Sequence, residues 1–185
     1  MNRASLPGEE EQYRIYSAAA KKLGGLPLTI RTMDIGGDKE AECLHLDKEE
    51  NPFMGYRAVR ISLDRKDLRM PQLKAILRAA KDGNIWVMFP MIALKRELDG
   101  MLRALEEAKA ELDAEGAPYG ELSRAGIMVE VPSAVMMMDH LAKTAEFVSI
   151  GSNDLTQYTY AADRMNPRVG YLNDFLDPAV LRGVS

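Results

Sequence analysis

Short apolar runs of strand length alternate along this chain with segments whose apolar residues recur at helical spacing. The clearest runs are residues 85–90, 126–130 and 147–151, and weaker candidates lie at 28–31 and at 55–63, where the alternation is loose. Unbroken apolar runs are typical of strands that are buried on both faces of a parallel sheet. The alternation therefore predicts an α/β fold in which crossover helices join parallel strands.

Helical periodicity is clearest at residues 94–112, where apolar residues form one stripe and charged residues lie opposite. Glycines follow several of the helical segments and favour their termination. The predicted helices cover residues 9–23, 70–80, 94–112, 132–142 and 155–162, with a further helix beginning after Pro178.

Two architectures satisfy this order of elements, an open doubly wound sheet and part of a (β/α)8 TIM barrel. The sequence contains neither the glycine-rich turn G-x-G-x-x-G nor a Walker A loop, which disfavours the open sheet. A complete barrel usually takes about 250 residues. This chain of 185 residues supplies about five strand–helix units, so it falls short of a whole barrel.

Composition argues against several classes of function. The net charge of -4 disfavours nucleic acid or an anionic membrane as the main partner. No apolar run approaches the length of a membrane span, and the N-terminus has no apolar signal core. The single cysteine, Cys43, cannot form an internal disulfide, so we expect a cytoplasmic protein.

Polar side chains stand at or near the ends of the candidate strands. The carboxyl ends of parallel strands meet at one edge of the sheet, so these side chains are expected to face one rim. They comprise two carboxylates, one amide and three guanidinium groups: Arg31, Arg57, Glu130, Asn153, Asp154 and Arg164.

This set of groups suits recognition of a multiply charged phosphate. Two carboxylates can hold Mg²⁺, which completes its coordination with water and substrate oxygens. Arginine presents a planar fork of donors that matches phosphate or carboxylate oxygens. The combination therefore predicts a site for a phosphorylated ligand together with Mg²⁺.

Simpler interpretations exist for most of these residues. Arg31 could be a salt-bridge partner, and Asn153 with Asp154 could cap the helix that follows. Glu130 is harder to explain, because it directly follows four apolar residues, where a carboxylate needs a partner. The functional interpretation therefore depends on convergence of the whole set. The histidines, His45 and His140, have no metal-site spacing.

Five blocks of the sequence, in order, resemble Enzyme I of the bacterial phosphoenolpyruvate:sugar phosphotransferase system. They are residues 30–39, 49–60, 88–91, 126–132 and 149–158. Pyruvate phosphate dikinases and phosphoenolpyruvate synthases share the Glu-Val-Pro and Asn-Asp-Leu-Thr-Gln blocks and are the alternative. The Asp-Ile-Gly-Gly-Asp-Lys block favours Enzyme I. The resemblance implies one incomplete domain over residues 1–185, about strands two to six of its phosphoenolpyruvate-binding barrel.

The resemblance also implies a reaction, Mg²⁺-dependent transfer of the phosphoryl group from phosphoenolpyruvate to a histidine and then to the carrier protein HPr. This relay begins sugar uptake. By match to the family's motifs, Glu130 and Asp154 would ligate the metal. The residues that would bind substrate are Arg31, Lys39, Arg57, Asn153, Asp154 and Arg164.

The chain also departs from the family in ways that affect activity. The accepting histidine of the family lies in a separate N-terminal domain, and neither histidine of this chain lies in its motif. The family's acid cysteine lies in a strand that would follow Ser185, so Cys43 does not correspond to it. We therefore expect no catalytic residue here and no phosphotransfer by the chain alone. The rival hypothesis is a non-catalytic module, a truncated barrel that only binds ligand or self-associates. Such a barrel would expose strand edges, which favours a homodimer or aggregation.

Overall fold

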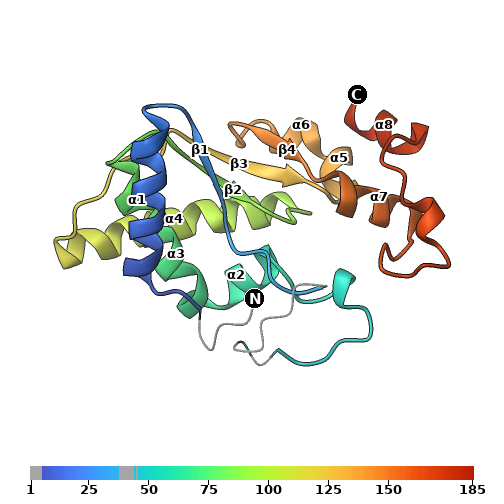
Figure 1. The fold of residues 1–185 in the computed structure, drawn as a ribbon, viewed down its shortest axis with the longest axis horizontal. Coiled ribbons are helices and arrows are strands. Elements are labelled where there is room, and N and C mark those ends of the chain that lie inside the picture. Colours follow the sequence, from blue (N-terminus) through green and yellow to red (C-terminus); the bar gives the residue numbers. More distant parts are fainter. Residues whose placement is uncertain (1–5, 38–43, 45) are drawn as a thin grey trace.

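The computed structural model describes residues 6–37, 44 and 46–185, and within these ranges it contains one parallel sheet (Figure 1). The sheet has four strands in the order β1-β2-β3-β4, and every neighbouring pair is parallel. Helices lie between successive strands, so the fold is the α/β partial barrel that the sequence predicts. The strands are β1 (Leu28–Arg31), β2 (Ile85–Phe89), β3 (Arg124–Val129) and β4 (Val148–Ile150).

Most of the helices lie close to their predicted positions. The first, α1, has the bounds read from the sequence, and it ends at Gly24, whose φ of 57° is the left-handed conformation that glycine adopts readily. The described helices are α1 (Glu9–Leu23), α2 (Val59–Asp64), α3 (Lys66–Ala80), α4 (Lys95–Glu115), α5 (Pro132–Met136), α6 (Met138–Leu141), α7 (Ser152–Tyr160) and α8 (Pro178–Val184), with short 3₁₀ turns η2 (Pro52–Met54) and η3 (Gly170–Leu172).

The prediction of a strand at 55–63 is wrong, and the described part of the chain has four strands instead of five. The segment contains a turn and all of α2 except its last residue. Ala58 has φ 50° and ψ −121°, which is incompatible with a continuous strand, and its N–H donates to Ile35 O. The helix predicted at 132–142 is also divided into α5 and α6, because Met137 leaves helical geometry at φ −107° and ψ 16°.

The core lies between the sheet and the helices α3 and α4. Ile85, Val87 and Phe89 of β2 are fully buried, whereas Trp86 and Met88, which alternate with them, are only half-buried. The apolar run of β2 therefore has one face in the core and a second face that is partly open. At the edge of the described sheet, Val148 and Ile150 of β4 are about half exposed.

Candidate functional site

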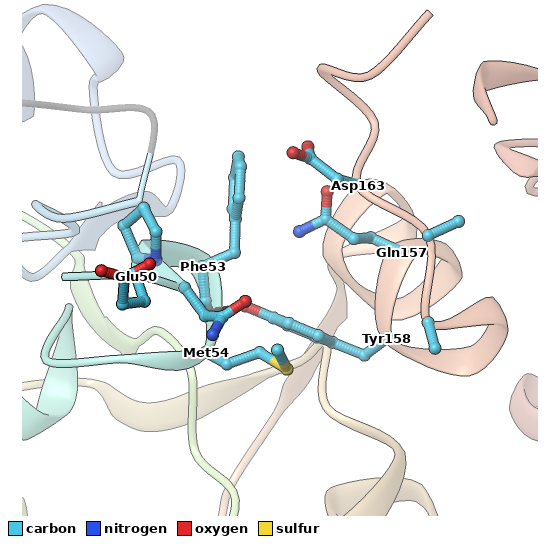
Figure 2. A pocket seen from close by; sticks show the side chains of 10 residues that line it. Glu50, Phe53, Met54, Gln157, Tyr158 and Asp163 are labelled. Atoms are coloured by element: carbon cyan, nitrogen blue, oxygen red, sulfur yellow. Dashed lines mark hydrogen bonds between the residues drawn. The ribbon is translucent and has the colours of Figure 1, made fainter. Parts of the chain in front are cut away.

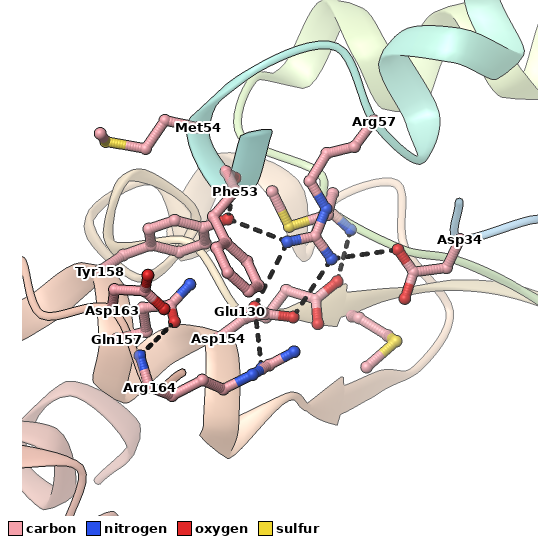
Figure 3. Close-up of polar contacts among 12 residues, drawn as sticks. Asp34, Phe53, Met54, Arg57, Glu130, Asp154, Gln157, Tyr158, Asp163 and Arg164 are labelled. Carbon is pink, nitrogen blue, oxygen red and sulfur yellow. Dashed lines mark hydrogen bonds and ion pairs between the residues drawn. The ribbon is translucent and has the colours of Figure 1, made fainter. Parts of the chain in front are cut away.

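The predicted site is built at the carboxyl ends of the strands (Figure 3). Arg31 is the last residue of β1, and Glu130 directly follows β3. Asp154 lies in the first turn of α7, two residues into the helix that follows β4. The N-terminus of a helix stabilises a carboxylate electrostatically. Three separate strand–helix junctions therefore contribute charged groups to one region.

Arg57 lies at the centre of this region and has no exposed surface. Its Nη2 lies 3.2 Å from Asp34 Oδ1, and its Nη1 and Nη2 each lie 3.4 Å from an oxygen of Asp154. Burial alone would lower the pKa of the guanidinium, but the charges of Asp154, Tyr158 and Asp34 raise it above its ordinary value. Arg57 is therefore a permanent cation, and its charge is balanced by carboxylates from two different segments.

Two aromatic residues hold Arg57 in place. The Tyr158 hydroxyl accepts a hydrogen bond from Arg57 Nη1 at 3.1 Å and donates one to the carbonyl oxygen of Phe53. The Phe53 ring centroid lies 5.9 Å from the Arg57 guanidinium carbon and 5.2 Å from that of Arg164. Both distances are within the range of cation–π attraction.

Two more arginines extend the ion pairs toward solvent. Arg164 Nη1 lies 3.2 Å from Asp154 Oδ1, and the Arg164 side chain is 15% exposed. Arg31 Nη1 lies 3.5 Å from Asp34 Oδ2, and the Arg31 side chain is 41% exposed. Cations and anions therefore alternate along a path that we call the arginine–aspartate chain. Its members are Arg31, Asp34, Arg57, Asp154 and Arg164.

Glu130 lies beside this chain as a buried carboxyl group, only 1% exposed (Figure 3). Its Oε1 accepts a hydrogen bond from the Met91 N–H at 2.6 Å. The pKa of Glu130 is raised to about 7, mainly by burial and further by the charges of Asp154 and Asp34. The Met91 hydrogen bond and the charge of Arg57 oppose this rise. Glu130 therefore carries only part of a negative charge near neutral pH.

The structure brings together five of the six strand-end residues predicted to converge. Arg31, Arg57, Asp154 and Arg164 belong to the arginine–aspartate chain, and Glu130 lies beside it. Asn153 is exposed at the start of α7, and its side chain makes no hydrogen bond with any residue that the structure describes. Lys39 lies outside the described residues.

The sequence interpretation missed Asp34, Tyr158 and Phe53. Asp34 follows Arg31 by three residues in the same sequence block, and Tyr158 follows Asp154 by one helical turn, so both spacings were available as signals. Nothing in the sequence indicates that Phe53 covers two guanidinium groups. The burial of Arg57 was also unexpected, because a residue near an open rim should contact water.

The carboxylates of Glu130 and Asp154 fit Mg²⁺, although they are only two ligands. Among the described residues, no group of three or more His, Cys, Asp or Glu side chains could hold a metal ion. Mg²⁺ is commonly bound by one or two carboxylates, with water and substrate oxygens completing its coordination. Glu130 and Asp154 supply such oxygens, and the repulsion between them is what a divalent cation would relieve. Both Asp154 oxygens also face arginines in this structure.

No helix within the described ranges combines the length and apolar character that crossing a bilayer requires.

This chain is similar in sequence to proteins that are named phosphotransferases or phosphoryl transfer proteins. The chain is 49% identical over 185 residues to the phosphoenolpyruvate-protein phosphotransferase of Priestia megaterium, covering 100% of this chain and 32% of that protein. The corresponding protein of Latilactobacillus sakei is 48% identical over 182 residues, covering 98% and 32%. A multiphosphoryl transfer protein of Rhodobacter capsulatus is 50% identical over 182 residues, covering 98% and 21%.

The chain thus spans about a third of the length of the first two relatives. The family model described as "PEP-utilising enzyme, PEP-binding domain", where PEP is phosphoenolpyruvate, matches residues 1–185. Because that match covers the whole chain, the chain belongs to the phosphoenolpyruvate-binding domain family of phosphoenolpyruvate-utilising enzymes.

Proposed function

We propose that this chain is the phosphoenolpyruvate-binding part of an Enzyme I phosphotransferase, and that the arginine–aspartate chain binds the substrate. The observation that carries the proposal is the set of three guanidinium groups joined through two carboxylates at the strand ends. Phosphoenolpyruvate has a phosphate and a carboxylate, and both match the donor fork of arginine. The relatives' names favour Enzyme I over the dikinase and synthase alternative.

The three arginines differ in their access to the substrate. Arg31 and Arg164 have exposed surface and can meet an anion directly. Arg57 is enclosed, but its Nε has no hydrogen-bond partner among the described residues, which leaves one donor available. Arg57 can therefore contact substrate only after a neighbouring side chain moves. Until then it contributes positive potential to the site.

Glu130 and Asp154 are the residues that would hold Mg²⁺. When bound, the ion would neutralise charge on the phosphate and on the enolate that is left behind. The arginines stabilise the phosphoryl group as it separates, because fixed donors act strongly in a site that excludes water. The chain's own contribution is therefore positioning and electrostatic stabilisation.

By the same proposal, a protein of the relatives' full length would pass the phosphoryl group to a histidine and then to HPr, in the cytoplasm and as a homodimer. The 185-residue chain is expected to be inactive in this reaction, since neither of its histidines lies in the acceptor motif. Incubating it with phosphoenolpyruvate, Mg²⁺ and HPr measures this directly. Formation of phosphorylated HPr would contradict the prediction.

Calorimetric titration with phosphoenolpyruvate, with and without Mg²⁺, tests the binding site. Arg31→Ala and Arg164→Ala should each weaken binding about 10- to 100-fold, since a hydrogen bond to a charged group contributes about 1.5–3 kcal/mol. Arg14→Ala is the matched control, because Arg14 is exposed on α1 and pairs only locally with Glu10. Absence of binding in the parent chain would favour the non-catalytic module instead.

A further inference from the structure

A cavity of about 270 Å³ lies between η2 and the C-terminal end of α7 (Figure 2). Phe53 and Met54 line it from one side, and Gln157, Tyr158 and Ala162 from the other. No member of the arginine–aspartate chain is among its lining residues, and neither is Glu130. It therefore adjoins the site described above and shares Phe53 and Tyr158 with it. Its volume is just below the range of about 300–1,000 Å³ that is typical of ligand pockets, so it suits a small ligand.

The amide group of Gln157 lies beside this cavity with a donor that is not used. Gln157 is 4% exposed, and its Oε1 accepts a hydrogen bond from the Arg164 N–H at 2.9 Å. This bond orients the amide, so Nε2 is held in the opposite direction. Figure 2 shows the nitrogen pointing toward Phe53 across the cavity. Nε2 is buried and has no hydrogen-bond partner among the described residues, so an occupant can reach it only after a neighbouring side chain moves.

A buried donor without a partner is energetically costly, so an acceptor placed opposite it would be stabilised. The remaining walls define the rest of the occupant. Phe53, Met54, Tyr158 and Ala162 offer apolar surface. The carboxylates of Glu50 and Asp163 also belong to the lining, and they would repel an anion.

We propose that this cavity binds a small uncharged molecule with an apolar, planar body and one carbonyl oxygen, which accepts a hydrogen bond from Gln157 Nε2. Such a ligand differs in charge from phosphoenolpyruvate, so the proposal does not depend on the function of the neighbouring site. The occupant would contact Phe53 and Tyr158, the side chains that hold Arg57.

Side-chain amide NMR tests the proposal with benzamide as the probe. The sequence has only three glutamines, and the other two are paired, Gln12 with Pro7 O and Gln72 with Tyr16 Oη. Benzamide should shift the Gln157 amide signals saturably and leave those of Gln12 and Gln72 unchanged. Benzoate has the same shape with a negative charge and should bind at least 10-fold more weakly.

Two variants separate specific binding from general adsorption. Gln157→Met removes the donor at similar length, and benzamide should then lose at least 10-fold in affinity, measured from the Met54 methyl signal. Met54→Trp fills the mouth of the cavity from an exposed position and should also weaken binding without disturbing the fold. The methyl of Met136, exposed on α5, is the control signal. Equal shifts with benzoate, unchanged Gln157 signals, or undiminished affinity in Met54→Trp would overturn the proposal.

Discussion

Arg57 has lost all contact with water, yet it remains charged. Burying a guanidinium group without partners would cost several kcal/mol. Asp34 and Asp154 compensate for the burial, and the Tyr158 hydroxyl occupies one further donor position. Burial likewise raises the pKa of Glu130, and the charges of Asp154 and Asp34 act in the same direction. The charge of Arg57 opposes them but does not cancel the rise.

Glu130 should make the stability of the metal-free chain depend on pH. Its pKa is raised from 4.5 to about 7, so the folded state holds the proton more tightly than the unfolded state. This stabilisation is complete below about pH 4.5 and is lost as the pH rises to 7. The total loss is about 3 kcal/mol in the free energy of unfolding.

Glu130→Gln should remove this loss, because glutamine keeps the acceptor for Met91 and never ionises. Urea denaturation between pH 4 and pH 8 measures the effect, and the variant should exceed the parent in stability at pH 8. Glu121→Gln, at a largely exposed side chain, should follow the parent curve. If Glu130→Gln reproduces the parent's pH dependence, the raised pKa is wrong.

At the scale of elements, the sequence predicted strands well where flanking signals were strong. The predicted bounds of α1 and β1 match the observed ones. The glycines between the two elements interrupt both the helical and the strand pattern. The strand predicted at residues 55–63 was wrong because nine residues with loose alternation fit a strand and a helix equally well. Ala58 has a positive φ, which ends any extended segment. An alanine in the sequence does not indicate that its φ will be positive.

The junction between β4 and α7 depends on a close approach at Gly151. A Cβ at this position would lie 2.4 Å from Glu130 Oε2 and 2.6 Å from Glu130 Cβ. Gly151→Ala should therefore displace the Glu130 side chain and destabilise the chain by about 1–3 kcal/mol. The Met91 amide proton signal should also shift, since its acceptor moves.

Urea denaturation and an amide NMR spectrum check both parts of this prediction. Gly170→Ala is the matched control, because an added Cβ there has no atom within 4 Å. A Gly151→Ala variant with parental stability and an unchanged Met91 signal would show that the junction tolerates a side chain.

At the scale of the whole molecule, Arg57 connects segments that are far apart in the chain. Asp34 precedes it by 23 residues, and Asp154 follows it by 97. The rule that strand ends share one edge predicted Arg31, Glu130 and Asp154. It could not predict the ion pairs of Arg57, because burial and pairing depend on how the loops fold over the sheet.

Replacing Arg57 should therefore lower the free energy of unfolding of the whole molecule. Arg57→Met leaves two buried carboxylates without their main partner, and we expect a loss of about 3–5 kcal/mol in the free energy of unfolding. Arg31→Ala should cost less than about 1 kcal/mol, because Arg31 is partly exposed and its ion pair is screened. Urea denaturation compares the two, and equal losses would contradict the central position of Arg57.

The enclosure of Arg57 has a consequence for how an anion is received. The guanidinium was stripped of its hydration when the chain folded, so an arriving dianion does not have to dehydrate it again. The anion would instead compete with Asp154 for the same donors, and under the proposed function its binding would be an exchange of counter-ions at a buried group. A carboxylate released in this way is free to turn toward a metal, which would link the arrival of the two charged ligands to one side-chain rotation.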